Sequence, residues 1–143
     1  FVTCWPGTIK PGTTDKMVCT VDLAASMAAL TGQSLSKNAC PDSFNVLPSL
    51  LGKANAKGRD HLIQQPNKGP TLALRIGDWK VLSFANAKAM KHLTYEKGPG
   101  KYELYNLAAD PHEKKNLVKQ QPEKLQMMLK RLESIKEAGR SRP

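Results

Sequence analysis

Lys101-Tyr-Glu-Leu-Tyr-Asn-Leu-Ala-Ala-Asp-Pro-His-Glu-Lys-Lys-Asn-Leu117 is the stretch that decides the fold of this chain. Residues 102–107 place Glu103 and Asn106 among apolar side chains, a pattern typical of a β-strand. Asp110-Pro111 predicts a tight turn, because proline presets φ at a turn position and disfavours helix in the residue before it. The end of the stretch leads into a long terminal helix. The sequence therefore predicts a strand, a turn and a helix in one compact unit.

The terminal helix is expected over residues 122–138. Pro122 suits the first helical position, and Glu123 in the first turn suits the helix dipole. Apolar side chains recur at helical spacing in one stripe about 100° wide. They are Leu125, Met128, Leu129, Leu132 and Ile135. This stripe must be buried, and the nearest surface is the apolar face of a sheet. Residues 140–143 are expected to be a frayed tail.

Three further strands are expected upstream, at residues 61–65, 71–76 and 79–84. Gly77-Asp78 lies between two alternating runs and indicates a hairpin turn. Strands close in sequence pair most economically as an antiparallel meander. The predicted fold class is therefore α+β, with a small antiparallel sheet of about four strands packed against the terminal helix.

The first part of the chain has a different pattern. An apolar strand is expected at residues 1–5, and a helix over residues 20–31 with Thr20 as its N-cap and Gly32 at its C-terminal cap. Because the apolar side chains of this helix cover two adjoining faces, we expect it to be buried on most sides. A single helical turn is expected within residues 46–52.

The length and composition of the chain are those of about one globular domain. It has 143 residues, 40% of them hydrophobic, and a net charge of +10. The charge favours anionic partners. However, the lysines are spread along the chain, without an RNA-binding aromatic signature or a tight arginine cluster, so a solvated basic surface is the simpler interpretation and argues against nucleic acid. Lysines at 88, 91, 97 and 101 could line a groove for a sulfated or phosphorylated ligand, with a solvated loop as the alternative. No apolar run approaches the ~20 residues of a membrane span.

Residue chemistry offers few catalytic candidates. The three histidines, His61, His92 and His112, lack metal-ligand spacing. Asp60 could orient His61, but a structural histidine is the favoured interpretation. The aspartates at 22, 78 and 110 are explained by a helix start and two turns. We therefore predict no catalytic, cofactor-binding or metal-ligating residue in this chain.

The three cysteines, Cys4, Cys19 and Cys40, form no CxxC pair. A disulfide between two of them is left open, and a metal site is disfavoured at these spacings. Cys4 and Cys19 lie in apolar runs, so we expect them to behave as small buried hydrophobic residues.

Five stretches, in this order, resemble the C-terminal third of a type I sulfatase of the arylsulfatase A-like family, which has an alkaline-phosphatase-like fold. Residues 1–12 resemble the strand and loop that follow the catalytic half. Residues 21–32 (VDLAASMAALTG) are similar to the "VDLxPTLLDLAG" helix, with alanine in place of the proline, and residues 46–52 to "LLPLLxG". Residues 74–82 (LRIGDWKVL) and 103–117 resemble "xRxGDWKLI" and "ELYDLxxDPxExxNL".

The resemblance implies that the catalytic machinery lies elsewhere. Sulfatases of this family use calcium and a formylglycine made within a C/S-x-P-x-R motif, both in the N-terminal part. Cys40-Pro41-Asp42 is not that motif, because proline follows the cysteine directly. Residues 1–52 would then be the tail end of the α/β catalytic domain and residues 53–143 the C-terminal subdomain.

The intact enzyme would hydrolyse sulfate esters, in a periplasmic or extracellular location. The fragment would pack on the missing catalytic domain and could shape a wall of the cleft for the sulfated substrate. Two alternatives from the residues stay open. One is a stand-alone basic module for sulfated glycans or nucleic acid. The other is an interaction domain that uses an apolar seam at Phe1, Val2, Trp5 and the helix at residues 21–30.

Overall fold

The computed structural model describes residues 2–66, 71–84 and 101–142. The chain forms two compact units. One contains the residues up to Asp60 together with those from Gly139 onward, and the other contains residues His61–Ala138. The chain thus leaves the first unit after Asp60 and returns to it at Gly139.

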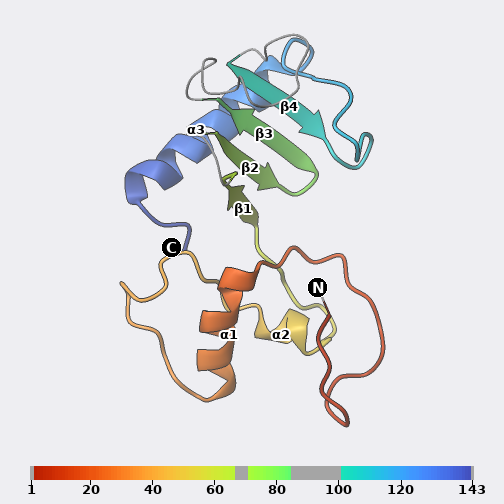
Figure 1. The fold of residues 1–143 in the computed structure, drawn as a ribbon, viewed down its shortest axis with the longest axis vertical. Helices are drawn as coiled ribbons and strands as arrows, with labels where there is room; N and C mark the ends of the chain where they lie inside the picture. Colours follow the sequence, from red (N-terminus) through yellow and green to blue (C-terminus); the bar gives the residue numbers. More distant parts are fainter. Residues whose placement is uncertain (1, 67–70, 85–100, 143) are drawn as a thin grey trace. The chain divides into compact units, whose positions relative to one another are not determined.

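The second unit is built on a four-stranded antiparallel sheet with the strand order β1-β2-β3-β4 (Figure 1). The strands are β1 (His61–Gln64), β2 (Leu72–Ile76), β3 (Trp79–Ser83) and β4 (Tyr102–Asn106). Gly77 turns the chain between β2 and β3 with a φ of +55°, a conformation that glycine adopts without steric cost. The predicted meander is confirmed: β1, β3 and β4 end one residue earlier than expected, and β2 begins one residue later.

Helix α3 (Pro122–Ala138) lies across this sheet (Figure 1) and has the bounds that the sequence predicted. Leu74 pairs with Val81, and Val81 with Leu104, so these three side chains line one face of the sheet. The helix packs its apolar stripe on that face. The buried core contains Leu74, Val81, Leu104, Leu125, Met128, Leu132 and Ile135. Burying each such side chain stabilises the unit by roughly 1.5–3 kcal/mol.

The segment between β4 and α3 is held by its own polar side chains. The carboxylate of Asp110 accepts a hydrogen bond from the N–H of Lys115 at 2.7 Å. The N–H of Leu117 donates to the carbonyl of Leu104 at 2.8 Å. The side-chain oxygen of Asn116 also accepts a hydrogen bond from the N–H of Leu104 at 3.2 Å. These bonds fasten the turn to β4 and bring the chain to the start of α3.

The first unit contains η1 (Thr20–Asp22), α1 (Leu23–Leu30) and α2 (Leu47–Leu50). The helix expected over residues 20–31 is therefore a 3-10 turn followed by an α-helix. Thr20 was the wrong N-cap: Cys19 occupies that position, and the carboxylate of Asp22 accepts its N–H at 2.8 Å. Gly32 has a φ of +70°, as expected for a C-terminal cap.

The strand expected at residues 1–5 is not formed by residues 2–5, which have no regular secondary structure. Instead, the carbonyl of Trp5 accepts hydrogen bonds from the N–H groups of Thr8 and Ile9, which makes a turn. A β-strand needs a neighbour to satisfy its backbone, and the sheet of the described residues contains only β1 to β4. Apolar composition alone was therefore not enough to make this segment a strand.

The expectation that the first helix is buried on most sides was wrong. Val21, Leu23, Met27 and Leu30 are all exposed, by 37–48% of their surface. The side chains that this unit buries are mostly polar. They are Asp22, Ser26, Ser43, Ser49 and Arg59, with Ala25 and Val46 as the apolar ones.

The chain end was also predicted wrongly as a frayed tail. The guanidinium of Arg142 donates to three carbonyl oxygens, those of residues 36, 37 and 39, at 2.8–3.2 Å. Its backbone N–H donates to the carbonyl of Pro41 at 2.9 Å. The N–H of Ser141 donates to the carboxylate of Asp42 at 2.8 Å. Residues 141 and 142 are therefore fastened to the 36–42 loop.

Candidate functional site

The most concentrated polar chemistry of the first unit surrounds the carboxylate of Asp22. One carboxylate oxygen accepts hydrogen bonds from the guanidinium of Arg59 at 2.5 Å and from the N–H of Phe44 at 3.0 Å. The other accepts from the N–H of Cys19 at 2.8 Å. The guanidinium also donates to the carbonyl of Asp42 at 3.0 Å and lies 4.3 Å from the centroid of the Phe44 ring. Both charged side chains are almost completely buried.

This arrangement suits a structural role better than a chemical one. The carboxylate is surrounded by three donors, so it joins the N-terminus of η1, the segment at Phe44 and the chain at Arg59. Hydroxyl groups add similar links: Ser43 accepts from the N–H of Ala25 at 2.8 Å, and Ser26 accepts from the N–H of Val46 at 3.0 Å. Sequence reasoning explained Asp22 by a helix start and missed the ion pair, because its partner lies 37 residues away.

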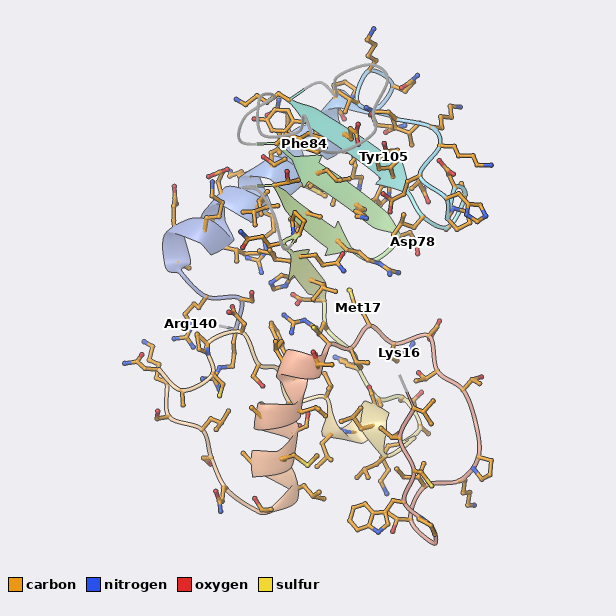
Figure 2. The ribbon with its side chains drawn as sticks, viewed as in Figure 1. Lys16, Met17, Asp78, Phe84, Tyr105 and Arg140 are labelled. Carbon is orange, nitrogen blue, oxygen red and sulfur yellow. The ribbon has the colours of Figure 1, made fainter. Side chains whose placement is uncertain are left out.

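A second buried carboxylate lies on the sheet of the other unit, on the face away from α3. Glu103 and Tyr105 are two residues apart on β4 and therefore share that face. The hydroxyl of Tyr105, labelled in Figure 2, donates to the carboxylate of Glu103 at 3.0 Å. On neighbouring β3, Lys80 forms an ion pair with Glu113 at 2.6 Å. Strand periodicity suggested that Glu103 lies on a polar, exposed face of its strand. The residue is only 6% exposed and is therefore buried.

The histidines do not come together in the described residues. His61 is buried on β1, on the same side of the sheet as Leu74, and Asp60 is exposed. His112 is exposed in the turn after Asp110. His92 lies outside the described residues.

Of the lysines considered for an anion groove, those at 88, 91 and 97 lie outside the described residues. Lys101 is exposed, and its ammonium nitrogen lies 5.2 Å from the centroid of the Tyr102 ring. A single exposed lysine does not define a groove.

The cysteines are all free thiols. Cys4 and Cys40 are exposed and Cys19 is partly buried, so the expectation of burial was wrong for Cys4. Cys4 lies in the segment at residues 2–5, which forms no strand and is exposed throughout.

Within the described ranges, no three His, Cys, Asp or Glu side chains lie together in a group that could hold a metal ion. No helix of these ranges is long and apolar enough to cross a membrane. The pKa of the Asp15 carboxyl lies below its usual value because Lys16, 3.3 Å away, hydrogen-bonds to it and stabilises its charged form. Both side chains of this pair are exposed.

Comparison with known proteins places these features in a family. The family model for "N-sulphoglucosamine sulphohydrolase, C-terminal" matches residues 1–138. The chain belongs to this sulfatase C-terminal family. The predicted resemblance to sulfatases is thereby confirmed.

Two curated relatives are sulfatases. The chain is 39% identical over 138 residues to an N-acetylgalactosamine-6-O-sulfatase of Bacteroides thetaiotaomicron, a match that covers 95% of this chain and 27% of that protein. It is 32% identical over 130 residues to human arylsulfatase A, with 80% of this chain and 25% of the relative covered. The chain thus spans about a quarter of the length of these relatives.

Solved structures agree on the fold. A structure from a study of glycosaminoglycan metabolism by Bacteroides thetaiotaomicron ("BT33336S-sulf") matches 93% of this chain and 28% of its own, with a TM-score of 0.78 and 38% identity. The structure titled Ps i-CgsB matches 91% of this chain and 27% of its own, with a TM-score of 0.65 and 22% identity, which shows a shared fold alone. The α+β class predicted from the sequence is that of sulfatase C-terminal domains.

Proposed function

We propose that this chain is the C-terminal part of a sulfatase that hydrolyses sulfate esters, and that it contributes structure rather than catalytic groups. The observation that carries the proposal is the family match over residues 1–138, together with two sulfatase relatives of which the chain spans about a quarter. In this proposal, residues 1–52 end the catalytic domain and residues 53–143 form the C-terminal subdomain.

The buried polar groups support a structural role. Three donors surround the Asp22 carboxylate, and Tyr105 bonds the Glu103 carboxylate. These groups do not fit the calcium that sulfatases use, because a calcium ion needs six to eight oxygen ligands and each of these carboxylates already serves neighbouring donors. No catalytic step is therefore assigned to the described residues.

The substrate to test first is a 6-O-sulfated N-acetylgalactosamine, since a relative with 39% identity is named for that activity. The cleft wall that the family resemblance implies would then meet a sulfated sugar, and the net charge of +10 is complementary to it.

Activity assays of two purified proteins test the proposal. The complete polypeptide, including the part that precedes Phe1, should hydrolyse N-acetylgalactosamine 6-sulfate or 4-nitrophenyl sulfate in a calcium-dependent manner. The 143-residue chain alone should not. Turnover by the isolated chain would overturn the structural role, and inactivity of the complete polypeptide on every sulfate ester tried would overturn the sulfatase assignment.

A further inference from the structure

The chain crosses between the two compact units at two places, after Asp60 and at Gly139. Within the first unit, both crossings are fastened to the same residue. The carbonyl oxygen of Asp42 accepts a hydrogen bond from the guanidinium of Arg59 at 3.0 Å. The carboxylate of Asp42 accepts one from the N–H of Ser141 at 2.8 Å. The segments on either side of the second unit are therefore joined through one residue of the first.

The second crossing is held by several further hydrogen bonds. We call residues 139–142 the strap. One nitrogen of the Arg142 guanidinium donates to three carbonyl oxygens of the 36–39 segment, and the backbone N–H of Arg142 donates to the carbonyl of Pro41. The side chain of Arg140, labelled in Figure 2, donates to the carbonyl of Arg142 at 2.8 Å. A single charged side chain thus supplies much of what closes the strap.

The loop that receives the strap depends on partners for its shape. Residues 36–42 form no helix or strand. Cys40 within the loop has a φ of +48°, a conformation that residues other than glycine seldom adopt. Local preference therefore does not explain the path of this loop. Arg59, Ser141 and Arg142 hydrogen-bond to it from outside, and two of these three residues belong to the strap.

We propose that the strap is a conformational clasp that stabilises the second unit, although the hydrogen bonds that close it lie within the first. The physical reason lies in the unfolded state. While both crossings are fastened, an unfolded second unit is a closed loop of roughly 80 residues, and such closure restricts the chain as a disulfide does. When the strap opens, the unfolded segment is fixed at one end only and gains entropy. This inference does not rest on the proposed function.

A purely local role of the strap is the alternative. In that case the strap orders the 36–42 loop and has no effect on the second unit. The N–H of Ser43 reports on the loop, because it donates to the carbonyl of Cys40. The N–H groups of Leu104 and Leu117 report on the second unit, because they donate to the side chain of Asn116 and to the carbonyl of Leu104. Hydrogen exchange at these positions separates the two roles.

Native-state hydrogen exchange of the 143-residue chain tests the clasp, because exchange tracks the population of opened states. Arg142→Ala removes the guanidinium from the strap. It should accelerate exchange at Ser43, and also at Leu104 and Leu117 by roughly tenfold, the factor that a hydrogen bond of a charged group is worth. Faster exchange at Ser43 with unchanged rates at Leu104 and Leu117 would overturn the clasp in favour of the local role. Unchanged rates at all three would overturn both roles.

Lys37→Ala is the matched control. It removes a positive charge from an exposed side chain of the same loop and keeps the carbonyl that accepts from Arg142. The exchange rates at Leu104 and Leu117 should stay within roughly twofold of those in the unchanged chain. An acceleration equal to that of Arg142→Ala would overturn the proposal, because the effect would then come from lost charge rather than from an open strap.

Asp42→Ala opens the strap by a smaller change and keeps the test decisive if Arg142→Ala does not fold. It removes the carboxylate that accepts from Ser141 and keeps the carbonyl that accepts from Arg59. Exchange at Leu104 should rise several-fold, because one neutral hydrogen-bond donor loses its charged acceptor. A rate at Leu104 equal to that of the unchanged chain would overturn the proposal.

Discussion

The guanidinium of Arg59 lies 2.5 Å from the carboxylate of Asp22, and both side chains are almost completely removed from solvent. Breaking a buried ion pair from one side leaves the other charge without compensation, which typically costs about 3–5 kcal/mol. The stability of the first unit should therefore depend strongly on this ion pair.

Asp22→Asn should destabilise the first unit by about 3–5 kcal/mol, because Arg59 stays buried without its counter-charge. The loss of stability should appear in hydrogen exchange measurements as faster exchange at the backbone N–H groups of Cys19 and Phe44, which both donate to Asp22. Glu133→Gln is the control, since it removes an exposed ion pair with Lys136 and should change stability by less than about 1 kcal/mol.

The double variant Asp22→Asn with Arg59→Met should recover part of that loss, because no uncompensated charge remains. Unchanged exchange at Cys19 and Phe44 in the single variant would mean that the ion pair adds no net stability.

Met128→Ala should lower the free energy of unfolding of the second unit by about 2–5 kcal/mol, because the side chain is fully buried between α3 and the sheet. Met127→Ala, at the neighbouring exposed position, should change it by less than about 0.5 kcal/mol. Urea denaturation followed by circular dichroism measures both. Similar values for the two variants would contradict the packing of α3.

Gly58→Ala should destabilise the first unit by about 1–3 kcal/mol through overpacking. A Cβ at this position would lie 2.6 Å from the carbonyl oxygen of Met17 and 2.8 Å from its nitrogen, and backbone atoms cannot easily move away. Gly12→Ala is the matched control, because nothing lies within 4 Å of a Cβ there. Thermal melts of the two variants should therefore separate, and coincident melts would refute the close approach at Gly58.

Arg142→Ala should make the 36–42 loop accessible to proteases, because it removes three hydrogen bonds to that loop. Limited trypsin digestion should then cut after Lys37 several-fold faster than in the unchanged chain, since cleavage follows the population of the opened loop. Lys136→Ala, on the exposed side of α3, should not change that rate. If cleavage after Lys37 is equally fast in all three proteins, the chain end does not hold the loop.

Local patterns predicted the second unit well. The stripe from Leu125 to Ile135 specified the bounds and the buried face of α3, and Gly77-Asp78 specified the β2–β3 turn. Both signals act over a few residues and agree with the packing, so sequence reasoning could recover them.

The first unit was predicted less well, because its structure depends on partners distant in sequence. No local sequence pattern indicates that Asp22 pairs with Arg59, or that Arg142 donates hydrogen bonds to the carbonyl groups of the 36–39 segment. Apolar residues at the chain start and on α1 suggested burial, but Val2, Trp5 and Met27 are exposed in the structure.

The sequence by itself determined the α+β class and the strand order, since side-chain periodicity and turn residues encode local structure directly, and its motifs carried the resemblance to the sulfatase family. Tertiary structure alone decided which polar groups are buried, which end of the chain is fastened and which face of α1 is left bare. The physical reason is that the burial of a charge or of an apolar stripe depends on what lies opposite it, and that partner is specified elsewhere in the chain.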